Sequence, residues 1–122
     1  MGFCIMKFTV YHNPRCRKSR EVVQFLQEKG LSFDTVKYLE QSFDKNTLGE
    51  VLKKIDKKPS EILRKNEVLW KKEYSSKDLS EYQILQLLVK QPKLIERPIV
   101  TTKEKGVLAR PIEKLMEFLN NE

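Results

Sequence analysis

The sequence predicts an α/β fold, with a mixed four-stranded sheet and a helical insertion. Short apolar and β-branched runs lie near both ends of the chain, whereas the middle carries only helical patterns. The length of 122 residues suits one domain that can bury a core of its own, and no repeat or linker divides it. We therefore expect a single domain over residues 1–122, with the insertion at about residues 44–90.

The first third predicts a strand, a loop, a helix and a second strand. Met6 to Tyr11 is an apolar and β-branched run that meets the turn-forming residues His12-Asn13-Pro14. From Cys16 the apolar spacing is helical, and Gly30 supplies a stop. The helical stripe comprises Val22, Val23, Phe25 and Leu26. Phe33 to Leu39 alternates as a strand does, which completes a βαβ unit with a right-handed connection.

Three helix starts are expected in the insertion, at Asp44, Ser60 and Ser80. Each precedes apolar residues at helical spacing, and the side-chain oxygens of Asp and Ser accept hydrogen bonds from the first N–H groups of a helix. The apolar positions are Leu48, Val51, Leu52 and Ile55 after Asp44; Ile62 and Leu63 after Ser60; and Ile84, Leu85, Leu87 and Leu88 after Ser80.

The last third returns to strands. Ile99 to Thr101 and Val107 to Ala109 read as a pair joined by a short turn at Gly106. Pro111 then fits the first turn of a final helix, which carries Ile112, Leu115, Met116 and Leu119. The whole order, βα, β, helices, ββα, is that of a thioredoxin-like sheet.

Charge and cysteine content narrow the possible functions. The formal charge of +7 favours anionic partners: nucleic acid, an acidic protein surface or a small oxyanion. Paired lysines such as Lys53-Lys54 read as a solvated helical face. The sequence shows neither a signal peptide nor an apolar run that could span a bilayer, so we expect a cytoplasmic protein without a membrane partner. Two cysteines in a reducing compartment suggest reactivity, not a disulfide framework.

Cys16 is the strongest candidate for chemistry. At a strand-to-helix junction, its sulfur would face unpaired backbone N–H groups and the positive end of the helix dipole, which favours the reactive thiolate. Arg15, Arg17 and Lys18 add positive charge nearby, and such a loop can also hold an oxyanion beside the sulfur. Ser19 makes the motif Cys-x-x-Ser, so an outside thiol would have to complete a redox cycle.

Other interpretations of these residues stay open. Cys16 could be a small buried hydrophobic side chain, and Ser19 an ordinary first-turn residue with a local hydrogen bond. His12 could satisfy a turn or tune the thiolate electrostatically. Cys4 precedes the first strand and has no evident role, although a part as resolving thiol is conceivable.

Three motifs resemble the glutaredoxin-coupled arsenate reductase family. They are Tyr11-His12-Asn13-Pro14-Arg15-Cys16-Arg17-Lys18-Ser19-Arg20, then Arg97-Pro98-Ile99-Val100, and Ala109-Arg110-Pro111. The resemblance extends over nearly the whole chain and includes the helical insertion and the order of the motifs. It implies the thioredoxin-like fold already expected from the order of elements.

The resemblance also implies an activity and a set of site residues. Cys16 would be the nucleophile that attacks arsenate, and glutathione, as co-substrate, would displace arsenite with help from glutaredoxin. Arg64, Arg97 and Arg110 would bind the oxyanion, because guanidinium groups bind tetrahedral anions through paired hydrogen bonds. His12, Asn13, Ser19 and Pro98 would support the site, with Pro98 matching a cis-proline position. We expect no metal and no bound cofactor.

Each arginine also has a simpler interpretation. Arg64 could be a helix-surface residue. Arg97 and Arg110 flank prolines at sheet edges, where such an explanation is weaker. The pair Arg17-Lys18 departs from the Gly-Thr typical of well-characterised members of the family, and this departure concerns the identity of the substrate more than the chemistry.

Two other functions are weighed against the reductase. The same family fold includes Spx-type regulators, which bind RNA polymerase and commonly carry a Cys-x-x-Cys switch; Ser19 argues against such a switch here. The only feature that favours direct nucleic-acid binding is the +7 charge, because the sequence shows no recognised binding motif and no clear aromatic stacking platform. We therefore expect no nucleic-acid partner.

Overall fold

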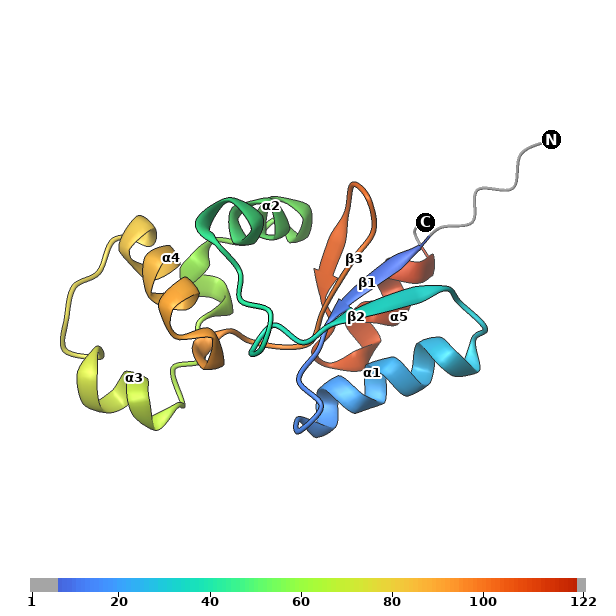
Figure 1. Ribbon diagram of the computed structural model, residues 1–122, viewed down its shortest axis with the longest axis horizontal. Coiled ribbons are helices and arrows are strands. Elements are labelled where there is room, and N and C mark those ends of the chain that lie inside the picture. The colour runs from blue at the N-terminus through green and yellow to red at the C-terminus, as the bar shows by residue number, and fades with distance from the viewer. Residues whose placement is uncertain (1–6, 121–122) are drawn as a thin grey trace. The chain divides into compact units, whose positions relative to one another are not determined.

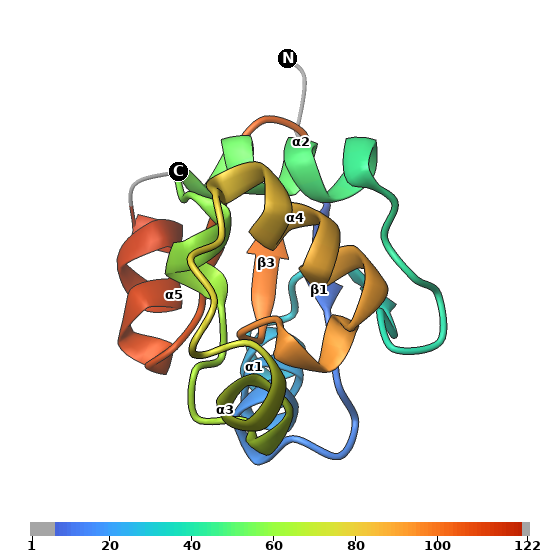
Figure 2. The same ribbon diagram turned by 90° about the vertical axis from the view of Figure 1, so that its left-hand side faces the viewer.

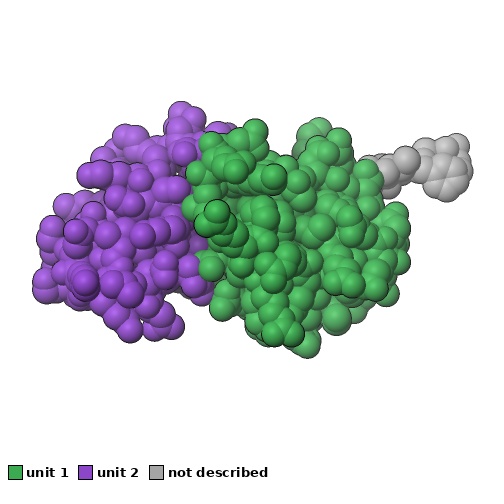
Figure 3. All heavy atoms as spheres, turned by 60° about the horizontal axis from the view of Figure 1, so that its bottom comes forward, with its two compact units in different colours: residues 1–41, 97–122 green, residues 42–96 purple. Residues whose placement is uncertain are grey.

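The computed structural model describes residues 7–120, which form two compact units (Figures 1 and 3). Within the described range, the first unit comprises residues 7–41 and 97–120, and the second comprises residues 42–96. The second unit corresponds to the insertion expected from the sequence. Each unit is described in turn.

The first unit is a four-stranded mixed sheet with two helices. Strand order is β2-β1-β3-β4; β1 pairs with β2 in parallel, whereas β1 with β3 and β3 with β4 are antiparallel. The strands are β1 (Phe8–Tyr11), β2 (Phe33–Val36), β3 (Ile99–Thr101) and β4 (Gly106–Leu108), and the helices are α1 (Arg17–Glu28) and α5 (Ile112–Asn120). This is the α/β architecture that the sequence predicts.

Helices α1 and α5 pack on the sheet through one apolar cluster (Figure 1). Alternation places Phe8 and Val10 of β1 on the same face, and the helical repeat brings Val22 and Leu26 of α1 against them. The cluster is completed by Val100, Ala109 and Leu115. Strand β1 is paired on both sides, with β2 and β3, so the position where the following loop begins is fixed by the sheet.

The regular elements of the second unit are helices, joined by loops. It contains α2 (Lys45–Ile55), α3 (Val68–Glu73), α4 (Glu81–Lys90) and the short 3-10 helices η1 (Pro59–Ile62) and η2 (Pro92–Leu94). Helix α4 packs against α2 and both 3-10 helices (Figure 2). Asp44 and Ser80 cap α2 and α4 through reciprocal capping boxes, as their positions in the sequence predict.

Two expected strand ends are wrong, whereas the expected start at Met6 lies outside the described residues. Strand β2 ends at Val36 instead of Leu39, because a turn follows from Tyr38, whose side chain is buried. The final strand ends one residue early, at Leu108, and Pro111 precedes α5.

Ser60 is not a helix cap. It lies inside η1, which begins at Pro59 after Lys58, and Leu63 leaves the helix to form an isolated bridge with Ile95. Proline fits the first turn of a helix, which explains why the start moves to position 59. Helix α3 was not expected.

Candidate functional site

Cys16 occupies the N-cap position of α1, directly after the loop that follows β1. Its backbone is extended (φ −92°, ψ 122°), and its N–H donates to the Asn13 carbonyl, 2.9 Å away. The side chain is only partly buried, so the interpretation as a buried hydrophobic residue does not hold. Within residues 7–120 Cys16 is the free cysteine, while Cys4 lies outside the described residues.

The pKa of Cys16 is lowered below the ordinary thiol value. Burial of the sulfur acts in the opposite direction, but it is outweighed by the Ser19 backbone N–H, by the Arg97 side chain and by the Lys18 backbone N–H. These groups stabilise the charged form of the thiol. The helix start therefore favours a thiolate, as its sequence position predicts.

The basic residues beside Cys16 in the sequence contribute less than expected. Arg15 and Arg17 are exposed, and Arg17 lies 3.8 Å from Glu21 in an ion pair on the surface of α1. Lys18 acts through its backbone N–H. The side chain that lowers the thiol pKa is Arg97, which precedes β3 and is far from Cys16 in sequence.

Ser19 has a structural role that its position alone did not reveal. It is fully buried, and its Oγ lies 2.8 Å from His12 Nδ1 and accepts a hydrogen bond of 3.0 Å from the Asn13 N–H. The Asn13 side chain accepts from the Arg15 N–H at 3.0 Å. These bonds fix the loop between β1 and α1, and hence the position of Cys16.

His12 is buried and its pKa is lowered. Burial is the main cause, and the charges of Lys37 and Arg20 act in the same direction, so the neutral imidazole is favoured. Ser19 Oγ thus shares a hydrogen bond with His12 Nδ1 and accepts a second one from the Asn13 N–H.

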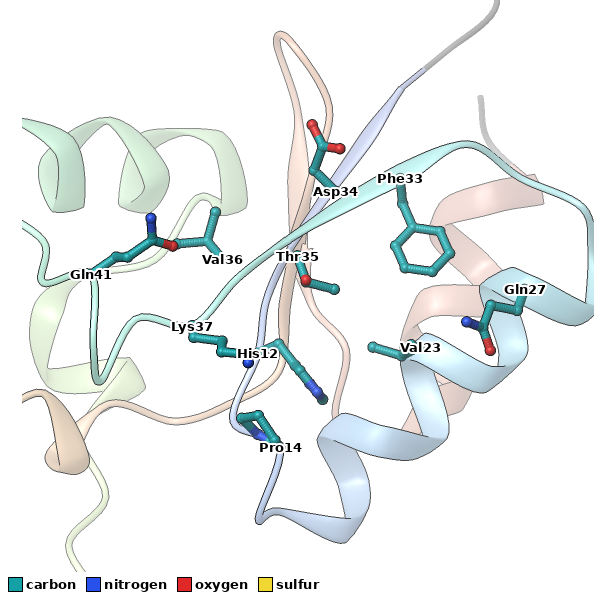
Figure 4. Close-up of a pocket in the computed structure, with 10 residues that line it drawn as sticks. All are labelled: His12, Pro14, Val23, Gln27, Phe33, Asp34, Thr35, Val36, Lys37 and Gln41. Atoms are coloured by element: carbon teal, nitrogen blue, oxygen red, sulfur yellow. The ribbon is translucent and has the colours of Figure 1, made fainter.

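His12 also lines an open groove between α1 and β2, with a volume of about 810 Å³ (Figure 4). Val23 and Phe33 supply apolar walls, and Cys16 is not among the lining residues. The other lining residues are Pro14, Gln27, Asp34, Thr35, Val36, Lys37 and Gln41. The groove was not expected from the sequence.

Arg97 and Arg110 lie together in the first unit. Each precedes a cis-proline, Pro98 and Pro111, and the first of these matches the isomer that the resemblance implied. Arg110 Nη1 donates to the Arg97 carbonyl oxygen at 3.4 Å. Arg97 Nε is buried and makes no hydrogen bond within the described residues. The structure thus brings Cys16, Arg97 and Arg110 to one end of the sheet.

Arg64 belongs to the second unit. It follows η1, is partly buried, and forms ion pairs with Glu67 and Glu96. The interpretation as a simple surface arginine therefore does not describe its surroundings. Its convergence with the other two arginines stays a prediction. Among residues 7–120, no three His, Cys, Asp or Glu side chains gather as a metal site requires.

Comparison with known proteins identifies the family. The family model of the ArsC family matches residues 11–118. The chain belongs to the ArsC family. It is 34% identical to an arsenate reductase from Haemophilus influenzae, over 93% of this chain and 100% of that protein. It is 40% identical to the uncharacterized protein YfgD of Escherichia coli K12, over 90% of this chain and 94% of that protein.

A solved structure shares the fold of this ArsC-family chain. The arsenate reductase from Vibrio cholerae has a TM-score of 0.85 and 32% identity, covering 92% of this chain and 97% of that one. Membership confirms the resemblance carried by the three sequence motifs and places the chain among thiol-dependent oxidoreductases. Within residues 7–120, no helix has the length and hydropathy needed to cross a bilayer.

Proposed function

We propose that the chain reduces arsenate to arsenite, with the Cys16 thiolate as nucleophile. The observation that carries the proposal is the pairing of a thiol of lowered pKa with Arg97, whose buried Nε is left without a hydrogen bond in the described part of the chain. An oxyanion beside the sulfur would supply the acceptor that this N–H needs. The arsenate reductases among its relatives support the choice of anion.

The reaction requires two electrons, which two thiols supply by becoming one disulfide. The Cys16 thiolate forms an S–As bond, and one arsenate oxygen leaves as water after protonation. A glutathione thiolate then attacks the Cys16 sulfur, and the S–As electron pair stays on arsenic, which leaves as arsenite. Glutaredoxin takes the glutathionyl group from Cys16 and restores the thiol.

Arg97, Arg110 and Arg64 are the proposed oxyanion ligands. Their charge persists at every physiological pH, so anion binding does not depend on their titration. We further propose that the reaction takes place in the cytoplasm, where glutathione is reduced, and that glutathione is consumed and not held as a bound cofactor.

Ser19 counts against the regulator alternative. Its hydroxyl is occupied by His12 and Asn13, and the position offers no second thiol for a Cys-x-x-Cys switch. The structure gives no positive support to polymerase binding.

A coupled assay tests the proposal. NADPH oxidation is followed with arsenate, glutathione, glutaredoxin and glutathione reductase, for the wild-type chain, Cys16→Ser and Cys4→Ser. Cys16→Ser should abolish arsenate-dependent oxidation, whereas Cys4→Ser should retain it. Equal rates for wild type and Cys16→Ser would refute the proposal, and loss of activity in Cys4→Ser would assign the resolving thiol to this chain.

A further inference from the structure

The guanidinium group of Arg64 lies between two carboxylates of its own unit. Its Nε is 3.2 Å from Glu96 Oε1, and its Nη1 is 3.7 Å from Glu67 Oε1. The side chains of Arg64, Glu67 and Glu96 are 21%, 31% and 29% exposed, so water screens these pairs less than it screens a fully exposed pair.

Backbone bonds hold Arg64 and Glu96 on adjacent segments. The Arg64 N–H donates to the Leu94 carbonyl at 2.7 Å, and the Glu96 N–H donates to the Ile62 carbonyl at 2.7 Å. Between these two bonds, Leu63 and Ile95 form an antiparallel bridge. These bonds hold the backbones of Arg64 and Glu96 side by side, so the two side chains start from adjacent segments.

The two carboxylates, of Glu67 and Glu96, differ in how well they can fix the guanidinium of Arg64. Glu67 is three residues after Arg64, and its Oε1 lies 3.7 Å from Arg64 Nη1, near the limit of an ion pair. Glu96 is closer, belongs to the partner segment, and engages Nε, the nitrogen nearest the rest of the side chain. Fixing Nε orients the whole planar group, because the five N–H donors of a guanidinium share one plane.

We propose that Glu96 is a positioning residue for Arg64, which fixes the orientation of the guanidinium through its Nε. This inference rests on the proposed function, in which Arg64 is an oxyanion ligand. Glu96 also precedes Arg97 directly, so one short segment carries both the residue that orients Arg64 and the arginine that lowers the pKa of Cys16.

Steady-state kinetics with arsenate provide the first test. Glu96→Ala should raise the KM for arsenate about three- to fivefold, the effect expected from loss of a partly buried ion pair, with kcat within about twofold of wild type. Glu96→Gln keeps an oxygen that can accept from Nε and should hold KM at or below the wild-type value. Glu67→Gln is the matched control and should leave both constants near wild type.

Hydrogen exchange at Arg64 Nε–H, followed by NMR, gives a readout that needs no turnover. The exchange rate should be slow in wild type and in Glu96→Gln, and several-fold faster in Glu96→Ala. An unchanged rate in Glu96→Ala overturns the inference whatever the activity, and so does an unchanged KM in an active enzyme. A wild-type chain that does not reduce arsenate refutes the proposed function, while exchange still decides whether Glu96 orients Arg64.

Discussion

Among single residues, Arg97 should control the reactivity of Cys16. Arg97→Gln removes the side-chain charge that lowers the thiol pKa, so the pH midpoint of Cys16 alkylation should move upward. In the wild type, the lowered pKa keeps more of Cys16 as thiolate at acidic pH. The alkylation rate of the variant should therefore fall below that of wild type at the acidic end of the pH range. Loss of a charge-assisted bond of about 1.5–3 kcal/mol should reduce kcat/KM about 10- to 100-fold.

Arg15→Gln is the matched control for this experiment. Arg15 adjoins Cys16 in the sequence, but its side chain is exposed and is not among the groups that shift the thiol pKa. Its midpoint should equal that of wild type. An Arg97→Gln midpoint at the wild-type pH would contradict the assigned role of Arg97.

Ser19 should matter more for stability than for thiol chemistry. Ser19→Ala leaves the buried His12 Nδ1 and the Asn13 N–H without their shared partner, which should cost about 1–3 kcal/mol in the free energy of unfolding. Urea denaturation provides the measurement. Ser76→Ala, at an exposed serine, should change the free energy by less than about 0.5 kcal/mol. Equal losses of unfolding free energy in the two variants would show that the hydrogen bonds of Ser19 do not stabilise the fold.

The sequence predicts that Cys16 lies at the start of a helix, but it does not predict the side chain that lowers the pKa of its thiol. A cysteine between a turn and a helical pattern is enough to place Cys16 at an N-cap. Sequence neighbours at a helix start point in different directions, and neither Arg15 nor Arg17 is among the groups that lower the pKa of Cys16. Arg97 comes from a segment distant in sequence, and only the family resemblance indicated it.

At the level of elements, the caps of the helical unit should be measurable one at a time. Ser80 Oγ accepts the Gln83 N–H at 3.2 Å, and Gln83 accepts in return from the Ser80 N–H at 2.8 Å. Ser80→Ala should therefore destabilise the chain by about 1 kcal/mol, measured by urea denaturation. Ser80→Asp, which can still accept from the first turn, should recover most of the loss. A substitution to Ala without effect would mean that α4 is held by its apolar face alone.

Elements with strong local signals are predicted well, and those fixed by tertiary contacts are not. Asp44 and Ser80 are true caps because the capping box is complete within four residues. Helix α3 buries none of its residues, so it leaves no apolar periodicity to detect. The segment after Ser60 forms a bridge with Ile95, a pairing that no local pattern contains.

For the molecule as a whole, the order of elements was sufficient for the fold class. Apolar runs at both ends and helices between them predict a mixed sheet with an insertion, and the observed order β2-β1-β3-β4 agrees. Strand pairing depends on contacts between the two ends of the chain, which residue patterns alone do not specify. The division into two compact units likewise follows from packing and not from any change in composition.

The net charge of +7 should act on Cys16 as a field that selects anionic reagents. Iodoacetate and iodoacetamide alkylate thiolates by the same displacement but differ in charge, so the ratio of their rates isolates electrostatic attraction. The ratio is measured for Cys16 in the Cys4→Ser variant, and at low salt it should exceed the ratio for free cysteine. It should fall toward the value for free cysteine as salt is raised from about 0.01 to 1 M, because the Debye length shrinks from about 30 to 3 Å over that range. In Arg97→Gln the ratio should drop at low salt, because the side-chain charge that acts on the thiol is gone. A ratio equal to that of free cysteine at low salt would show that the surface charge does not reach the thiol.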